Sequence, residues 1–197
     1  MIDKTFTIFK SALAFSHQIA RNKIKAGDIA IDATCGRGFD TLLLAGLVGE
    51  FGKVYAFDIQ EEAIESSRHR LAGEGLLERV EFIQDDHSQV DFYLAARPIM
   101  CMFNLGYLPG GDHSKTTRAS STITAFDKMA DLLLPGGSIT MVAYCGHKGG
   151  NEEVQALRLH LAGVSQRNLE VVELSFINQV NNPAHLFVAT KLNGGRE

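Results

Sequence analysis

Residues 29–41 read IAIDATCGRGFDT, and this stretch decides the fold. Its apolar start is short, which is typical of a buried parallel strand. Gly36 and Gly38 follow, and because glycine has no Cβ they allow a tight turn and a close approach of the backbone to a ligand. Asp40 then opens a helical run over residues 42–48. The pattern therefore predicts a strand, a glycine loop and a helix.

Acidic residues surround this loop and restrict the ligand that it can hold. Asp32 precedes the loop, Asp40 follows it, and Asp58 ends a second apolar strand twenty residues past Gly38. That spacing suits an acid that binds ribose hydroxyls. A nicotinamide or flavin dinucleotide site needs a third glycine three residues after the second, but Thr41 stands there. Acids also fit poorly against a pyrophosphate and well against a ligand with a cationic amino-acid end.

An acid, a spacer and G-x-G form the first motif of the class I S-adenosylmethionine-dependent methyltransferases, which this stretch resembles. The resemblance implies S-adenosyl-L-methionine as the cofactor. A glycine turn without any ligand is the alternative interpretation.

Length and composition fit one domain over residues 1–197. The formal charge of −4 argues against general phosphate attraction, so either the substrate is small or an RNA contact is local. We see neither a membrane-length apolar run nor a signal-peptide pattern, and therefore expect a cytoplasmic protein without membrane contact. Cys35, Cys101 and Cys145 lie at or near predicted strand ends without metal-ligand spacing, so we expect buried thiols and no metal.

Apolar strands and amphipathic helices alternate along the chain. Helical spacing runs from residue 11 to residue 25, where we predict that His17 faces the glycine loop unless it is an ordinary core histidine. Residues 169–176 and 186–191 indicate two strands joined by a polar loop without a crossover helix, so they should form an antiparallel hairpin. The predicted fold is α/β: a Rossmann-like class I methyltransferase with a mostly parallel seven-stranded sheet, a C-terminal antiparallel hairpin and helices on both faces. The other expected segments are strands at 80–83, 98–103 and 138–144 and helices at 61–71, 117–134 and 152–161.

Polar residues follow the third and fourth predicted strands, at the ends where open α/β sheets bind ligands. Asp85, Asp86 and His87 follow the third strand. In class I methyltransferases this position lies beside the adenine, so we expect Asp85 to accept a hydrogen bond from the adenine amine. Asp86 is the candidate cap of the next helix. Asn104 ends the fourth strand and precedes a loop at 105–116 whose length is usually functional.

The stretch Asn104-Leu-Gly-Tyr-Leu-Pro109 resembles the motif of amino-methylating enzymes, in which Asn or Asp precedes two prolines and an aromatic residue. The resemblance implies that Asn104 accepts from the target amine and that Tyr107 stacks on the base. Leu105 and Gly106 replace both prolines, which disfavours a planar ring amine and leaves room for a flexible aliphatic one. A turn cap at Asn104 and a partly buried Tyr107 are the alternatives.

Further motifs narrow the resemblance. Together with residues 104–109, the segments Gly110–His113 and Tyr144–Gly150 make the whole chain resemble a small bacterial family whose members are described as rRNA methylases. This family includes the tRNA 5-(aminomethyl)-2-thiouridine methyltransferase. Arg37 and Phe39 depart from the Asn and His that other members tend to carry, so the side-chain contacts at these two positions stay unassigned.

The family resemblance implies methylation of the aminomethyl nitrogen at position 5 of the tRNA wobble uridine, with the tRNA anticodon loop as partner and a homodimer left open. Methylation of rRNA or a small molecule, and a module that senses the cofactor without chemistry, are the alternatives. The implied catalytic residues are Asn104 and Tyr107. The implied cofactor-binding residues are Asp32, Thr34, Gly36, Gly38, Asp40, Thr41, Asp58, Ile59, Gln60, Asp85, His87 and Asn104. The implied substrate-binding residues are Tyr107, His113, Lys115, Arg118, Tyr144, His147 and Lys148. A solvated surface charge is the alternative for Lys115, Arg118, His147 and Lys148.

Overall fold

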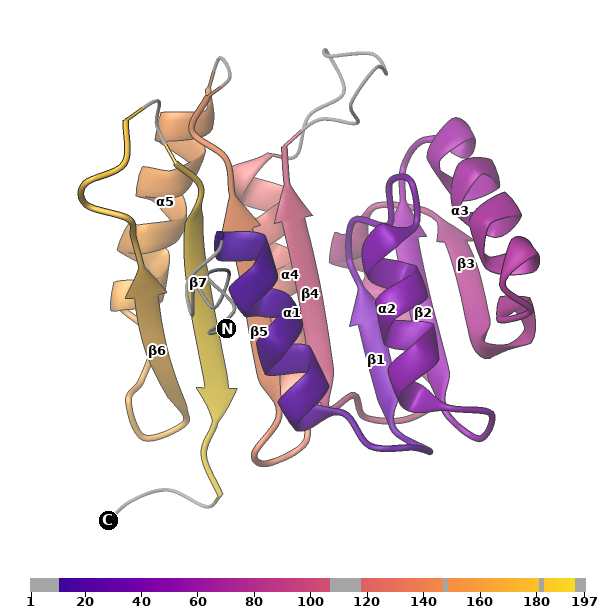
Figure 1. Ribbon diagram of the computed structural model, residues 1–197. Helices are drawn as coiled ribbons and strands as arrows, with labels where there is room; N and C mark the ends of the chain where they lie inside the picture. Colours follow the sequence, from indigo (N-terminus) through magenta and orange to yellow (C-terminus); the bar gives the residue numbers. More distant parts are fainter. Residues whose placement is uncertain (1–10, 107–117, 147–148, 181–182, 194–197) are drawn as a thin grey trace, which may run out of the picture.

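The computed structural model describes residues 11–106, 118–146, 149–180 and 183–193. Within these residues seven strands form one sheet, in the order β3-β2-β1-β4-β5-β7-β6 (Figure 1). The strands are β1 (Ile29–Asp32), β2 (Lys53–Asp58), β3 (Val80–Gln84), β4 (Met100–Leu105), β5 (Ser138–Ala143), β6 (Leu169–Leu174) and β7 (His185–Lys191). The α-helices are α1 (Ala12–Lys23), α2 (Phe39–Val48), α3 (Glu61–Gly73), α4 (Ala119–Leu132) and α5 (Gly150–Ala162), and the 3-10 helices are η1 (Leu77–Arg79) and η2 (His87–Phe92).

The direction of β7 distinguishes it from its neighbours. It lies between β5 and β6 and pairs antiparallel with both of them. The pairs β1 with β2, β1 with β4, β2 with β3 and β4 with β5 are parallel. The predicted sheet and its C-terminal hairpin are therefore confirmed.

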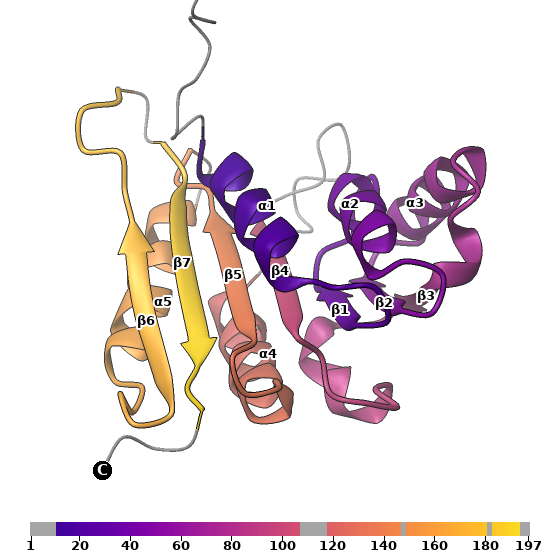
Figure 2. The ribbon, with the colours of Figure 1, turned by 60° about the horizontal axis from the view of Figure 1, so that its bottom comes forward.

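Helices cover both faces of the sheet. In Figures 1 and 2, α1, α2 and α3 lie on one face, and α4 and α5 lie on the other. Successive residues of a strand point to opposite faces of the sheet, so a strand contributes side chains to both hydrophobic cores. Ile31, Phe57 and Phe103 pack in the core that includes α4 and α5 residues. Ala30 and Met102 pack in the core that includes α1 and α2 residues.

Several predicted boundaries differ from the observed ones. The helix expected at 117–134 spans Ala119–Leu132, and η2, rather than an α-helix, follows β3. Asn104 lies within β4, one residue before its end, because the pairing with β5 continues to Leu105. Cys101 lies inside β4 and not at a strand end, opposite Ile31. All three cysteines are free and buried, as expected.

Several of the residues predicted to be functional lie at the carboxyl ends of the parallel strands. β1 lies between β2 and β4, so the chain turns in opposite directions across the sheet after β1 and after β3. A reversal of this kind creates the crevice in which open α/β sheets hold ligands. Of the helices in the described ranges, none has both the length and the apolar character needed to cross a membrane.

Candidate active site

The glycine loop owes its shape to two positive backbone angles. Gly36 has φ of 50° and Gly38 has φ of 77°, a region that side chains rarely adopt. A Cβ on Gly38 would lie 2.4 Å from Ser67 Oγ and 2.9 Å from Ser67 Cα. Glycine at this position therefore lets α3 approach the start of α2 closely.

The outer side of the loop is held by Arg70 of α3. Its Nε donates to the carbonyl of Arg37 at 2.7 Å, and its guanidinium lies 3.7 Å from the centre of the Phe39 ring. A cation over an aromatic face is attracted by the ring quadrupole. Phe39 thus has a structural contact that the sequence left unassigned, and no sequence signal marked Arg70.

Asp58, at the end of β2, lies against the loop. Its Oδ2 accepts from the Gly36 amide at 3.0 Å, and its Oδ1 accepts from the Gln60 amide at 2.9 Å. Burial raises the pKa of Asp58. Each oxygen retains a second acceptor site, because a carboxylate offers about four. Ile59, next to it, leaves 52% of its surface exposed although its side chain is large and apolar.

Asp32, at the end of β1, is the most deeply buried acid of the site. Its Oδ2 accepts from Thr41 Oγ1 at 2.6 Å, and its Oδ1 accepts from the Thr34 amide at 3.1 Å. Burial, and then the nearby Asp40 charge, raise the pKa of Asp32 to about 7. A cation that enters the site would lower this pKa and favour the ionised carboxylate.

Asp40 connects two helices and a strand. Its Oδ1 lies 2.5 Å from His17 Nε2 of α1, and its Oδ2 accepts from Asn104 Nδ2 of β4 at 3.1 Å. The Asn104 amide also donates to Thr34 Oγ1 at 2.7 Å. The prediction that His17 faces the glycine loop region is confirmed by this contact. The bond between Asp40 and Asn104 was not predicted.

Asp85, Asp86 and His87 follow β3, and their side chains make different contacts. Asp85 accepts from Tyr93 Oη at 2.7 Å, and Asp86 caps η2 by accepting from the Ser88 amide at 2.8 Å. The cap is as predicted, whereas the adenine contact of Asp85 stays a prediction. His87 is buried with Nδ1 2.9 Å from the Ala33 carbonyl, and its Nε2 has no partner within the described ranges. Sequence reasoning missed Tyr93.

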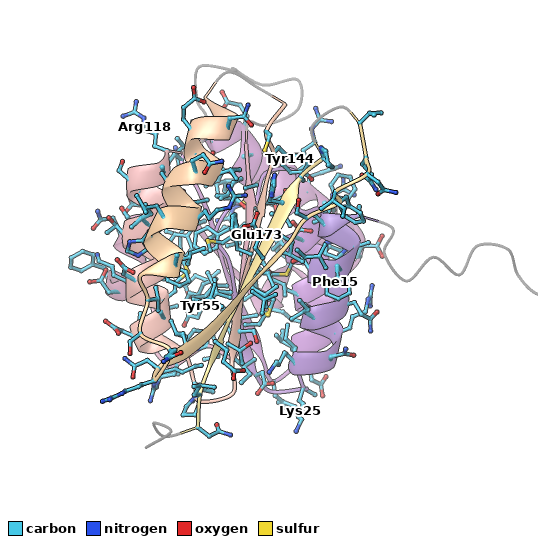
Figure 3. All side chains as sticks on the ribbon, turned by 90° about the vertical axis from the view of Figure 1, so that its left-hand side faces the viewer. Phe15, Lys25, Tyr55, Arg118, Tyr144 and Glu173 are labelled. Carbon is cyan, nitrogen blue, oxygen red and sulfur yellow. The ribbon has the colours of Figure 1, made fainter. Side chains whose placement is uncertain are left out.

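Tyr144 and Arg118 lie at the same end of the molecule, opposite Lys25 (Figure 3). Tyr144 follows β5 and leaves 41% of its surface exposed. Burial of its hydroxyl, and then the Asp40 charge, raise the pKa of Tyr144, which places it in the field of the site. Arg118 is exposed and precedes α4. The other predicted substrate residues lie outside the described residues: Tyr107, His113, Lys115, His147 and Lys148.

In the part of the chain that the structure describes, there is no cluster of three or more His, Cys, Asp and Glu side chains that could hold a metal ion.

The model of the family described as "Putative rRNA methylase" matches residues 54–190. The chain belongs to this family. An Arabidopsis thaliana relative, named tRNA (mnm(5)s(2)U34)-methyltransferase, chloroplastic, is 36% identical over 194 residues, covering 93% of this chain and 71% of the relative.

Two solved structures superpose closely on this chain. A Clostridium thermocellum protein, described as an rRNA methylase, shares 44% identity and a TM-score of 0.92. The match covers 93% of this chain and 99% of that one. A Streptococcus mutans methyltransferase solved in complex with SAH shares 33% identity and a TM-score of 0.86, with the same coverages. This member of the rRNA methylase family is an S-adenosylmethionine-dependent methyltransferase, and S-adenosylmethionine is its cofactor.

The residues at the strand ends fit that cofactor. Asp58 is fixed by two backbone amides and still has acceptor sites for ribose hydroxyls. Ile59 offers an exposed apolar surface beside it. Asp32 lies deeper, with no lysine or arginine paired to it among the described residues. The donor set is thus acidic and apolar, as a cationic adenosine derivative requires.

Proposed function

We propose that this methyltransferase N-methylates the 5-aminomethyl group of 5-aminomethyl-2-thiouridine at the tRNA wobble position, within one catalytic domain over residues 1–197. The observation that carries the proposal is the position of Asn104, at the strand end beside Asp40 and Thr34. The printed name of the Arabidopsis relative supports a tRNA wobble uridine as the substrate.

In this proposal the residues that would hold the cofactor stand at the carboxyl ends of β1, β2 and β3. Asp58 binds the ribose hydroxyls, and Ile59 and Asp85 contact the adenine. Asp32 and Asp40 lie at the methionine end, where their carboxylates complement an ammonium group, and Thr41 donates to Asp32 there. S-adenosylmethionine supplies a methyl group activated on sulfur, which a nucleophile takes as the carbon–sulfur bond breaks. The residues therefore contribute position and electrostatics.

The reacting amine must present a free lone pair. An alkyl amine resembling lysine has a pKa of about 10.4, so roughly one molecule in a thousand is neutral at neutral pH. Asn104 can hold the amine through its carbonyl oxygen and direct the lone pair toward the methyl group. Leu105 and Gly106 give the approach more room than two prolines would. The replacement of both prolines supports a flexible aliphatic amine as the nucleophile in this proposal.

The test is mass spectrometry of tRNA nucleosides from a strain without the gene. We expect 5-aminomethyl-2-thiouridine to accumulate and its N-methylated product to disappear. Purified protein should then restore the product on that tRNA with S-adenosylmethionine. An unchanged nucleoside profile would contradict the proposal.

The acidic balance of the chain favours one second candidate, methylation of a small molecule. Asp and Glu number 23 against 19 Lys and Arg, so general attraction to RNA is weak. A purified protein that methylates a free aliphatic amine but not the tRNA would support this candidate instead.

A further inference from the structure

We propose that His17 is a positioning residue for the methyl transfer, acting through Asp40 to turn the carbonyl oxygen of Asn104 toward the substrate amine. His17 belongs to α1, and Asn104 belongs to β4, 87 residues later. Asp40 joins them, with one carboxylate oxygen on each side. The proposal rests on the proposed function only for the identity of the amine.

The carboxylate determines how the Asn104 amide is turned. An ionised carboxylate accepts hydrogen bonds and donates none, so the amide group that faces Asp40 must be Nδ2. The 3.1 Å contact between Asn104 Nδ2 and Asp40 Oδ2 has this polarity. The carbonyl oxygen therefore points away from Asp40, and in the described part of the chain it has no donor of its own. The group presented to a ligand is an acceptor.

His17 holds the other end of the carboxylate. Because Asp40 accepts, His17 Nε2 must carry the hydrogen in the 2.5 Å contact. The Asp40 side chain is 6% exposed and that of His17 is 28% exposed, so the contact is shielded on the acid's side. Without a donor from α1, Asp40 would be free to rotate, and the Asn104 amide could turn with it.

Other charged or titratable groups face Asp40 as well. Asp32 of β1 interacts with it as a like charge, and Tyr144 after β5 lies within its field. Neither replaces the donor from His17. A like charge repels, and the structure places no hydrogen bond between Tyr144 and Asp40 within the described residues. His17 thus has a specific part in fixing the orientation of Asn104.

Three variants separate positioning from folding. In His17→Gln the side-chain amide can still donate to Asp40, whereas in His17→Ala no donor remains. His160→Ala is the matched control, because His160 Nε2 lies 2.7 Å from Asp127 Oδ1 on α4, a pair of the same kind on the other face of the sheet. The substrate is tRNA that carries 5-aminomethyl-2-thiouridine, and cofactor affinity is measured by calorimetry.

We expect His17→Ala to lower kcat about tenfold or more, since a misplaced group near the reacting atoms costs up to about a hundredfold. KM for tRNA should change little, and cofactor affinity should fall less than kcat does, because Asp32 and Asp58 keep their contacts with the loop. His17→Gln should restore kcat to within about threefold of the native value, and His160→Ala should leave it unchanged. An equal loss of kcat in His17→Ala and His17→Gln, or in His17→Ala and His160→Ala, would overturn the proposal.

Nitrogen NMR of the free protein tests the same contact without any activity. We expect neutral His17 to carry its proton on Nε2, and the Asn104 side-chain amide signals to shift in His17→Ala but not in His160→Ala. The positioning role would be contradicted if His17 carried its proton on Nδ1, or if the Asn104 amide signals stayed unchanged in His17→Ala. If the native enzyme leaves this tRNA unmethylated, the proposed function fails while the NMR result still decides the role of His17.

Discussion

The acidic residue Glu173 on β6 and the acidic residues at the ends of β1 and β2 differ in their hydrogen-bond partners and in the direction of their pKa shifts. On β6, Glu173 accepts from Arg158 Nε at 2.7 Å and lies 2.7 Å from His185 Nδ1. The hydrogen bond from Arg158 is the main reason that the pKa of Glu173 is lowered. At the end of β1, Asp32 is held by a hydroxyl and an amide, and burial raises its pKa to about 7.

The difference separates acids that are paired with basic side chains of the same chain from acids that are not. Glu173 has two basic partners from elements close to it, so its role is complete within the fold. Asp32 and Asp58 have neither lysine nor arginine paired to them among the described residues, and both have raised pKa values. Buried charge is unfavourable without a partner. Under the proposed function the bound cofactor supplies the missing partners, an ammonium group near Asp32 and ribose hydroxyls for Asp58.

Removal of Asp58 should have the largest effect on cofactor binding. Asp58→Ala should weaken cofactor binding by about 2–4 kcal/mol, because the ribose hydroxyls lose a charged acceptor. Glu173→Gln is the matched control and should leave cofactor affinity unchanged. Calorimetry with S-adenosylmethionine makes the measurement. An unchanged affinity in Asp58→Ala, or equal losses in both variants, would remove the distinction between the two groups.

Substitution of Asn104 should affect turnover and not cofactor binding. Asn104→Ala should lower turnover by roughly a hundredfold or more, on the scale of a lost positioned polar group. Its backbone contact with Thr34 survives, since the amide of the main chain makes it. Single-turnover kinetics and calorimetry together check this. A fully active variant, or one defective only in cofactor affinity, would contradict the role of Asn104.

The basic residues predicted to bind the substrate should have the smallest effect, confined to substrate binding. The triple variant with Lys115, Arg118 and Lys148 changed to Ala should raise KM for tRNA and flatten its salt dependence by up to about 0.7–0.9 log unit per lost phosphate contact. Cofactor affinity should survive, because Asp58 and the glycine loop remain. A salt series of tRNA methylation tests this, and an unchanged slope would place the RNA elsewhere.

Sequence reasoning reached the elements whose signals are local. The glycine loop, the Asp86 cap and the hairpin each depend on neighbouring residues, and each is present. Contacts between distant segments were not reachable, because they depend on how the sheet aligns its strands. Asp40 and Asn104 lie 64 residues apart, and Arg70 reaches Arg37 across 33 residues. The direction of His17 was predictable since helical spacing fixes which side of α1 it occupies.

The measurement that tests the central claim most directly is proton release when the cofactor binds. The pKa of Asp32 in the free protein is about 7, above its ordinary value, so the carboxyl is mostly protonated below that pH. A bound cation favours the ionised form, and cofactor affinity should therefore rise with pH up to about 7 and then level off. Calorimetry at about pH 6 in buffers of different ionisation enthalpy should show that the native enzyme releases a proton when the cofactor binds. The Asp32→Asn variant should release no such proton. Buffer-independent enthalpies, or the same proton release in Asp32→Asn, would contradict the account.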